Sequence, residues 1–212
     1  MSRVPHVFVA GPWDTRQLEL TAEKQRHLER VLRLSTGAEL TYTDGAGHSG
    51  TGVLDGGRLI RGQETSRRRT SNLTLAVAPP RSTDRTRFVV EKLSELGIAK
   101  LLWIDTDRST GSPPRSEKAL SWSIAALEQS LGVWLPEIGV ARLDELERAW
   151  LADEGGDPWP RGGFDSRDIV AIGPEGGWTD REKASHNLVS LGEPVFRIET
   201  AAVVAAVLDH HL

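Results

Sequence analysis

From residue 73 onward, short apolar runs alternate with amphipathic stretches, and this alternation constrains the fold more than any other feature. A mainly parallel sheet covered by helices on both faces, an α/β fold, is the architecture that this order predicts. Apolar periodicity places strands at 73–78, 100–105, 169–172 and 195–196, an extended segment at 133–140, helices at 86–96, 116–131, 143–150, 180–189 and 200–208, and a loop at 153–165.

The first 70 residues follow a different pattern, in which short apolar runs alternate with turn-forming residues. The pattern predicts strands at 7–9, 40–42, 51–54 and 58–60, and one helix within 23–34. We expect a small β barrel that carries this helix. A polar and basic stretch, 63–71, is expected to link a domain of residues 1–70 to a domain of residues 71–212.

Charge is distributed unevenly between these two parts. Residues 1–70 carry 11 Lys and Arg against 8 Asp and Glu, whereas the remainder carries 15 against 22. Because phosphate contacts dominate nucleic-acid affinity, a polyanionic partner is expected to meet the N-terminal part first. Ordinary scatter of surface charge explains the difference equally well.

Composition excludes several kinds of chemistry. With no cysteine, the chain has no disulfide, thiolate metal site or cysteine nucleophile. The six histidines show no spacing suited to a metal site, so no metal is expected. Apolar runs fall short of the ~20 residues that cross a bilayer, and residues 1–5 do not begin a secretory signal, so we expect a cytoplasmic protein without membrane contact.

Two unusual peptides follow expected strands in the C-terminal part. The buried strand 169–172 leads directly into Gly173-Pro174-Glu175-Gly176-Gly177, which is neither a GxGxxG nor a Walker loop. About 20 residues later, Leu191–Ala201 places Arg197, Glu199 and Thr200 before an apolar helix that Thr200 could cap. Two such loops near strand ends are what a divided ligand pocket requires.

Together these peptides resemble the two C-terminal motifs of the RsmE-type 16S ribosomal RNA (uridine-N3) methyltransferases, a branch of the SPOUT superfamily. Similar elements occur in family order elsewhere, namely His27-Leu28-x-x-Val31-Leu32-Arg33-Leu34 with Gly37, Glu95-Leu96-Gly97, Arg108-Ser109 and Glu128-Gln129-Ser130. The resemblance implies an N-terminal PUA-like β barrel that binds RNA and a C-terminal SPOUT domain with a deep trefoil knot. It also implies a homodimer.

The same resemblance implies S-adenosyl-L-methionine as cofactor and 16S ribosomal RNA, or the small ribosomal subunit, as partner. Arg197, Glu175 and Arg108 are the catalytic candidates, since arginines can stabilise charge that develops on uracil oxygens. The RNA-binding candidates are His27, Arg30, Arg33, Arg67, Arg68 and Arg69. Cofactor contacts are expected from Ile172, Gly173, Pro174, Glu175, Gly176, Gly177, Leu191, Gly192, Val195, Phe196, Arg197, Glu199 and Thr200.

Two positions depart from the family pattern. The family usually has an arginine two residues after the Glu-Gln-Ser element, and this chain has Gly132 there. The family also usually has a lysine just before the central helix, and here Ser82 lies near that place, although Arg81, Arg85 and Arg87 are close in sequence. These departures motivate an alternative function, a catalytically weakened or inactive RNA-binding homologue that retains the fold.

Overall fold

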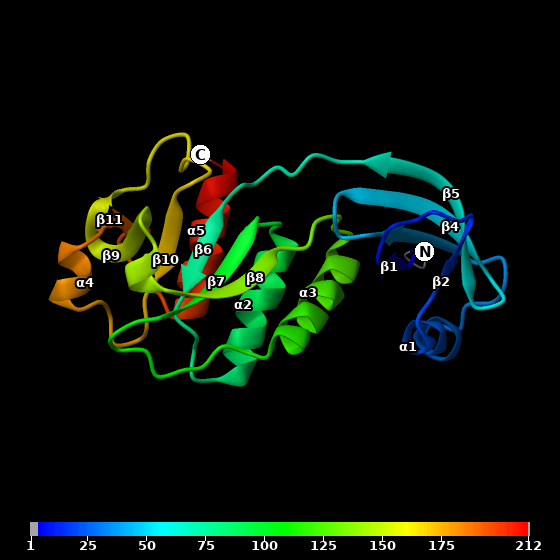
Figure 1. The fold of residues 1–212 in the computed structure, drawn as a ribbon, viewed down its shortest axis with the longest axis horizontal. Coiled ribbons are helices and arrows are strands. Elements are labelled where there is room, and N and C mark those ends of the chain that lie inside the picture. Colours follow the sequence, from blue (N-terminus) through cyan, green and yellow to red (C-terminus); the bar gives the residue numbers. More distant parts are fainter. Residues whose placement is uncertain (1–3, 212) are drawn as a thin grey trace. The chain divides into compact units, whose positions relative to one another are not determined.

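A computed structural model describes residues 4–211 of the chain, with side chains for 4–209. It divides into two compact units (Figure 1). The first unit comprises residues 1–69 and 124–135, and the second comprises 70–123 and 136–212. The C-terminal half of helix α3 (Ser116–Ser130) therefore belongs to the first unit.

A curled five-stranded sheet forms the first unit, with strand order β1-β3-β4-β5-β2. Its elements are β1 (His6–Phe8), β2 (Gln17–Glu19), α1 (Ala22–Arg26), a π-helical turn (His27–Val31), β3 (Glu39–Thr43), β4 (His48–Asp55) and β5 (Arg58–Ser66). The turn at Gly56-Gly57, with φ of 54° and 81°, joins β4 to β5. The expected strands and helix are present, whereas closure of the sheet as a PUA-like barrel stays a prediction.

Tyr42 lies at the centre of the first unit's core, with no measurable exposure. Its hydroxyl donates to Glu64 Oε1 at 2.5 Å, and Arg61 Nε donates to the same carboxylate at 2.6 Å. Burial and the hydrogen bond to Glu64 raise the pKa of Tyr42 to about 12, because the phenolate would be buried beside a negative charge.

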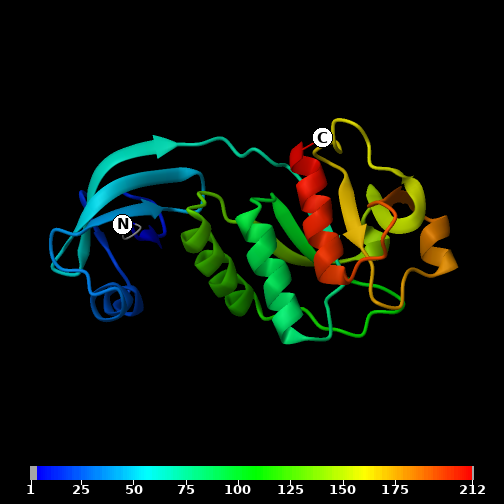
Figure 2. The ribbon, with the colours of Figure 1, turned by 180° about the vertical axis from the view of Figure 1, so that it is seen from behind.

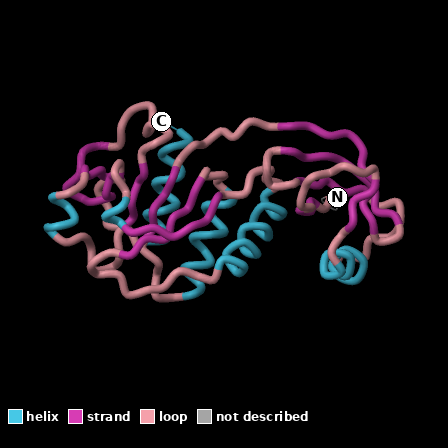
Figure 3. The backbone as a smooth tube through the Cα atoms, in the orientation of Figure 1, coloured by secondary structure: helices cyan, strands magenta, loops and turns pink. Residues whose placement is uncertain are grey.

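A six-stranded, entirely parallel sheet forms the second unit, in the order β11-β9-β10-β6-β7-β8 (Figures 1 and 3). The strands are β6 (Thr74–Val77), β7 (Lys100–Asp105), β8 (Glu137–Arg142), β9 (Ala149–Pro158), β10 (Ile169–Ile172) and β11 (Asn187–Ser190). The helices are α2 (Thr83–Glu95), α3, a 3-10 turn (Leu143–Glu145), α4 (Asp180–Ala184) and α5 (Ile198–His211).

Side chains of the central strands alternate between two cores, one on each face of this sheet. Leu75, Val77 and Val170 face the core that α2 and α5 cover, whereas Ala76 and Ala171 face the core closed by residues such as Leu143 and Trp178. Figure 2 shows α2 and α5 side by side over the first face. Burial on both faces explains why these strands are apolar throughout.

Several expected elements are wrong. The helix at 143–150 is a short 3-10 turn followed by β9, and β9 takes up residues 153–158 of the expected loop at 153–165. The helix at 180–189 ends at Ala184, after which the chain forms β11. Residues 195–196 are not in a strand, and residues 63–66 of the expected linker belong to β5. Pairing between distant strands overrides local helix propensity here.

The end of α3 has an unusual backbone. Leu131 follows the helix with φ of 58°, a left-handed conformation that glycine usually supplies. The amide of Gly132 then donates to Leu127 O at 2.9 Å, which closes a Schellman turn. Leu131 is 42% exposed, so little packing compensates for the strain.

We expect Tyr42, the single tyrosine, to titrate near pH 12 in the folded protein and near 10, its ordinary value, in the unfolded chain. Because the folded pKa is raised, the stabilisation is complete below pH 10 and is lost as the pH rises toward 12. The absorbance of tyrosinate as a function of pH measures the pKa of Tyr42, and circular dichroism at each pH confirms that the protein is folded. Glu64→Gln should lower the folded pKa, and titration of the native protein near pH 10 would contradict the buried contact.

Replacing Leu131 with glycine should raise the free energy of unfolding by about 0.5–1 kcal/mol, because relief of left-handed strain exceeds the added chain entropy. Urea denaturation measures the change. Leu131→Ala is the matched control, since it shortens the side chain and keeps the strain. A Leu131→Gly protein less stable than Leu131→Ala would show that the conformation is not strained.

Candidate functional site

A cavity of about 590 Å³ lies in the second unit, where β10 ends at Ile172 and the chain enters the loop Gly173–Gly177. We call it the glycine-loop cavity. The segment between β11 and α5 forms another part of its wall, and the middle of β9 and the loop after β7 supply further residues. In parallel α/β sheets, ligands commonly bind beyond the carboxyl ends of the strands.

The two peptides singled out in the sequence line this same cavity. Of the described residues expected to contact a cofactor, Gly176, Glu199 and Thr200 lie outside the lining. Thr200 sits within the first turn of α5, which begins at Ile198, so it does not cap that helix as expected. The expected residues that do line the cavity are Ile172, Gly173, Pro174, Glu175, Gly177, Leu191, Gly192, Val195, Phe196 and Arg197.

The glycine loop is shaped by its contact with Trp178. A Cβ atom at Gly173 would lie 2.8 Å from Trp178 Cε2, closer than real side chains approach. Trp178 is buried, and its Nε1 donates to Ala152 O at 2.9 Å, which ties the loop to β9. Gly177 closes the turn with φ of 68° and an amide that donates to Pro174 O. Trp178 is therefore both a packing residue and part of the cavity wall.

Arg108 reaches the cavity from the loop after β7. Its Nη1 donates to Gly176 O at 2.8 Å and to Trp178 O at 3.3 Å. The stem of the side chain also covers Gly176, because a Cβ atom there would lie 3.2 Å from Arg108 Cβ. Arg108 thus holds the backbone of the glycine loop.

Glu175 lines the cavity and pairs with Arg85, which lies in the first turn of α2. Arg85 Nη1 lies 3.7 Å from Glu175 Oε1, and Arg85 Nε lies 3.5 Å from Glu199 Oε1. The side chain of Glu199 is only 14% exposed, and within the described chain its buried Oε2 has no hydrogen-bond partner. Arg85 therefore links carboxylates of the two motif peptides.

Asp153, Glu154 and Lys183 also line the cavity, and the sequence alone did not reveal them. Lys183 Nζ lies 2.6 Å from Asp153 Oδ2. Burial alone would raise the pKa of Asp153, but the hydrogen bonds from Lys183 and from the Gly155 amide bring it below its ordinary value. Asp153 and Glu154 were missed because the sequence of 153–165 reads as a loop, whereas its first residues belong to β9.

Arg197 lies on the cavity wall and is exposed. Within residues 4–211 its guanidinium makes no ion pair, unlike Arg85 and Arg108, whose donors contact protein groups. Among the three catalytic candidates, Arg197 is thus the cation free to meet a ligand.

The RNA-binding candidates lie in the first unit. His27, Arg30 and Arg33 are exposed around the π-helical turn, beside Val31 (64% exposed) and Leu32 (43%). Arg67 and Arg68 are also exposed.

Arg69 differs from its two neighbours. Its guanidinium lies 4.6 Å from the Trp134 ring centroid, and Nη2 donates to Leu135 O at 2.9 Å. Burial lowers the pKa of Arg69. These contacts occupy Arg69 within the protein, because Trp134 and Leu135 belong to the same unit.

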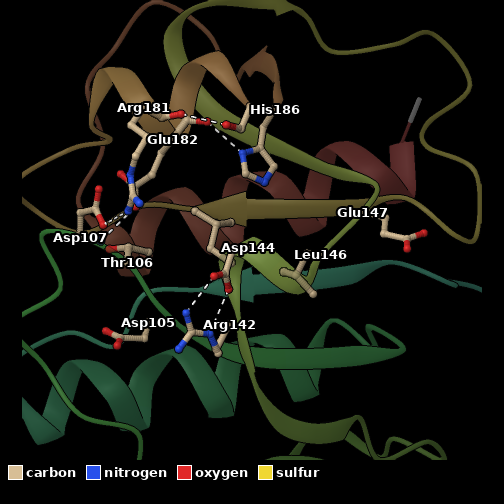
Figure 4. A pocket seen from close by; sticks show the side chains of 12 residues that line it. Asp105, Thr106, Asp107, Arg142, Asp144, Leu146, Glu147, Arg181, Glu182 and His186 are labelled. Carbon is tan, nitrogen blue, oxygen red and sulfur yellow. Dashed lines mark hydrogen bonds and ion pairs between the residues drawn. The ribbon is translucent and has the colours of Figure 1, made fainter.

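A second cavity of about 620 Å³ lies beyond β7 and β8 (Figure 4). Both of its arginines pair with lining carboxylates, since Arg181 contacts Asp107 and Arg142 Nη2 lies 2.8 Å from Asp144 Oδ2. The described residues include no cluster of three or more side chains suited to hold a metal ion. None of the helices in the described part of the chain has the length and apolar character of a membrane span.

Comparisons with known proteins find several ribosomal RNA methyltransferases that resemble this chain. A ribosomal RNA small subunit methyltransferase E of Synechocystis sp. is 27% identical, over 88% of this chain and 70% of that protein. A probable rRNA-methyltransferase from Porphyromonas gingivalis superposes with a TM-score of 0.81 and 26% identity, over 96% of this chain and 95% of that chain. A ribosomal RNA small subunit methyltransferase E from Neisseria gonorrhoeae, bound to S-adenosyl methionine, superposes with a TM-score of 0.81 and 25% identity. The match covers 97% of this chain and 96% of that chain.

The model of a protein family described as an RNA methyltransferase domain matches residues 67–208, two thirds of the chain. The matched region contains all of β6–β11 and the whole glycine-loop cavity. The resemblance drawn from the motifs is confirmed, and the chain belongs to this RNA methyltransferase family.

Proposed function

We propose that this chain transfers a methyl group from S-adenosyl-L-methionine to N3 of a uridine in 16S ribosomal RNA. The observation that carries the proposal is the glycine-loop cavity, which both motif peptides line in a chain of the RNA methyltransferase family. Relatives named as small-subunit ribosomal RNA methyltransferases, one of them bound to S-adenosyl methionine, support the choice of cofactor and substrate.

The cavity fits this cofactor in size and chemistry. Its volume, about 590 Å³, lies in the usual range for small-molecule sites. Apolar side chains such as Leu191, Phe196 and Ile198 suit the adenine ring, and bare backbone at Gly173 permits close approach. Glu154 and Glu175 line the cavity and would offer carboxylates to the ammonium and sulfonium charges of the cofactor.

S-adenosylmethionine supplies a methyl group on a positively charged sulfur. The protein must orient the uridine and assist loss of the N3 proton. Arg197 is the residue we assign to the uracil oxygens, because its unpaired guanidinium can stabilise the negative charge that develops there. Glu175, held by Arg85, orients the cofactor, and Arg108 holds the loop that approaches it.

RNA docking is assigned to residues 1–70, as a PUA-like domain. The exposed cations His27, Arg30 and Arg33, with exposed Val31 beside them, support this because they offer phosphate contacts and an apolar surface for bases. Arg67 and Arg68 are exposed and can extend the contact, whereas the contacts of Arg69 with Trp134 and Leu135 oppose its assignment.

The remaining assignments, a SPOUT domain of residues 71–212, a trefoil knot and a homodimer, rest on the second unit. Strand β11 pairs with β9 at one end of the sheet, whereas the following α5 contacts β6 and β10 in its middle, which supports a threaded C-terminus. Helices α2 and α5 are neighbours and expose Phe88 (41%) and Val207 (36%). Those apolar side chains support a second copy packing on this face.

An inactive RNA-binding homologue is the second candidate, motivated by the departures from the family pattern at Gly132 and Ser82. Gly132 belongs to the first unit and is not a lining residue, so the missing arginine removes no residue from the wall of the cavity in this chain. Ser82 is the N-cap residue of α2, and Arg85 one turn later supplies a cation to Glu175. These positions favour the active enzyme.

The wild-type protein should bind S-adenosylmethionine in calorimetry and transfer labelled methyl groups to small ribosomal subunits, or their 16S RNA, from a strain lacking this modification. Digestion should release N3-methyluridine. Arg197→Met should lower kcat by about 100-fold or more while cofactor binding changes little, because its charge acts on the uracil.

Large ribosomal subunits from the same strain are the matched control and should accept no label. RNA binding without methyl transfer would favour the inactive homologue. Absence of cofactor binding at millimolar concentration would overturn the enzyme assignment.

Gly173→Ala should weaken cofactor binding at least tenfold, because the added methyl group displaces the Trp178 indole from the wall. Near-ultraviolet circular dichroism should report the displacement, and calorimetry the affinity. Gly155→Ala is the control, since its Cβ atom would meet only ordinary contact with Asp153 at 3.4 Å. Equal effects of both substitutions would show that Trp178 packing does not shape the cavity.

A further inference from the structure

The loop that carries Arg108 is fixed by α4 through its neighbour Asp107. Glu182 Oε1 accepts a hydrogen bond from the Asp107 amide at 3.0 Å. The Asp107 carboxylate in turn accepts from Thr179 Oγ1 at 2.9 Å and pairs with Arg181. Figure 4 shows Asp107 beside Arg181 and Glu182. Both the backbone and the side chain of Asp107 are therefore held.

Glu182 makes more contacts than a capping residue requires. It forms a capping box with Thr179, whose amide donates to Glu182 Oε2 at 2.7 Å. That box uses one carboxylate oxygen, and the bond to Asp107 uses the other. Glu182 is only 6% exposed, so its charge depends on these donors.

The same loop contacts the glycine loop on its other side. Arg108 follows Asp107 directly and donates from Nη1 to Gly176 O and Trp178 O. A continuous set of hydrogen bonds thus runs from buried Glu182, through the Asp107 backbone, to the wall of the glycine-loop cavity. Asp107 and Glu182 line the second cavity, whereas Arg108 lines the first.

We propose that Glu182 and Asp107 are positioning residues that set the placement of Arg108 and hence the shape of the cofactor-binding glycine loop. The inference rests on the proposed function, since it assigns the glycine loop to the cofactor. A residue that merely caps α4 would affect stability alone. A positioning residue must act through Arg108, so its effect must disappear when Arg108 is removed.

The test is a double-mutant cycle of Glu182→Gln and Arg108→Met. Glutamine keeps the size of Glu182 but has one acceptor oxygen, so its amide group would face the N–H of either Asp107 or Thr179. Each single substitution should weaken cofactor binding in calorimetry about tenfold. The double variant should bind the cofactor with the same affinity as the single variant that binds it less tightly. Additive losses would overturn the proposal.

Asp180→Asn is the matched control, because Asp180 is exposed in the same helical turn. It should leave cofactor affinity within about twofold of wild type.

Asp107→Asn is a milder second variant, which keeps the backbone bond to Glu182 and weakens the side-chain contacts. It should weaken cofactor binding by less than Glu182→Gln, and an unchanged affinity in both variants would overturn the proposal.

Amide hydrogen exchange in the cofactor-free protein provides a readout that does not depend on the proposed function. Glu182→Gln and Arg108→Met should each accelerate exchange of residues 176–178, and the double variant should add nothing further. Asp180→Asn should leave this exchange unchanged. If wild type fails to bind cofactor while the exchange pattern holds, the proposed function fails and the positioning role stands. Unchanged exchange in Glu182→Gln would overturn the positioning role.

Discussion

The contact between the backbone of Gly173 and the indole of Trp178 is the constraint on which the site depends. It allows the chain leaving β10 to lie flat against a buried aromatic ring, whose Nε1 binds the carbonyl of Ala152 in β9. The end of β10, the loop that follows it and the neighbouring strand β9 are thereby fixed as one wall. Any side chain at Gly173 would separate the loop from that wall.

Charge around the cavity divides into groups that hold protein and groups left for ligands. Arg85 and Arg108 contact Glu175 and the carbonyl of Gly176, and Lys183 contacts Asp153. In the described chain Arg197 has no such ion pair, although it lies on the same wall. A preorganised site needs both kinds of residue, because a ligand-facing charge is useful only where its surroundings stay fixed.

The sequence predicted the strand 169–172, the glycine loop and the helices α2 and α5, because each depends on a local signal: an apolar run, a glycine cluster or helical spacing. It failed for β9 and β11, which gain stability from parallel pairing with strands distant in the chain. Acidic and glycine residues in β9 read locally as a loop. For that reason Asp153 and Glu154 were missed, although both line the predicted cavity.

Departures from a family motif acquire meaning only once their positions in the fold are known. Gly132 belongs to the first unit, where its carbonyl accepts from His6 Nε2 at 3.0 Å, and it is not among the residues that line the glycine-loop cavity. Near Ser82, the cation beside Glu175 comes from Arg85, which also approaches the buried carboxylate of Glu199. An arginine one helical turn after Ser82 therefore supplies a cation to Glu175, although the position near Ser82 departs from the family pattern.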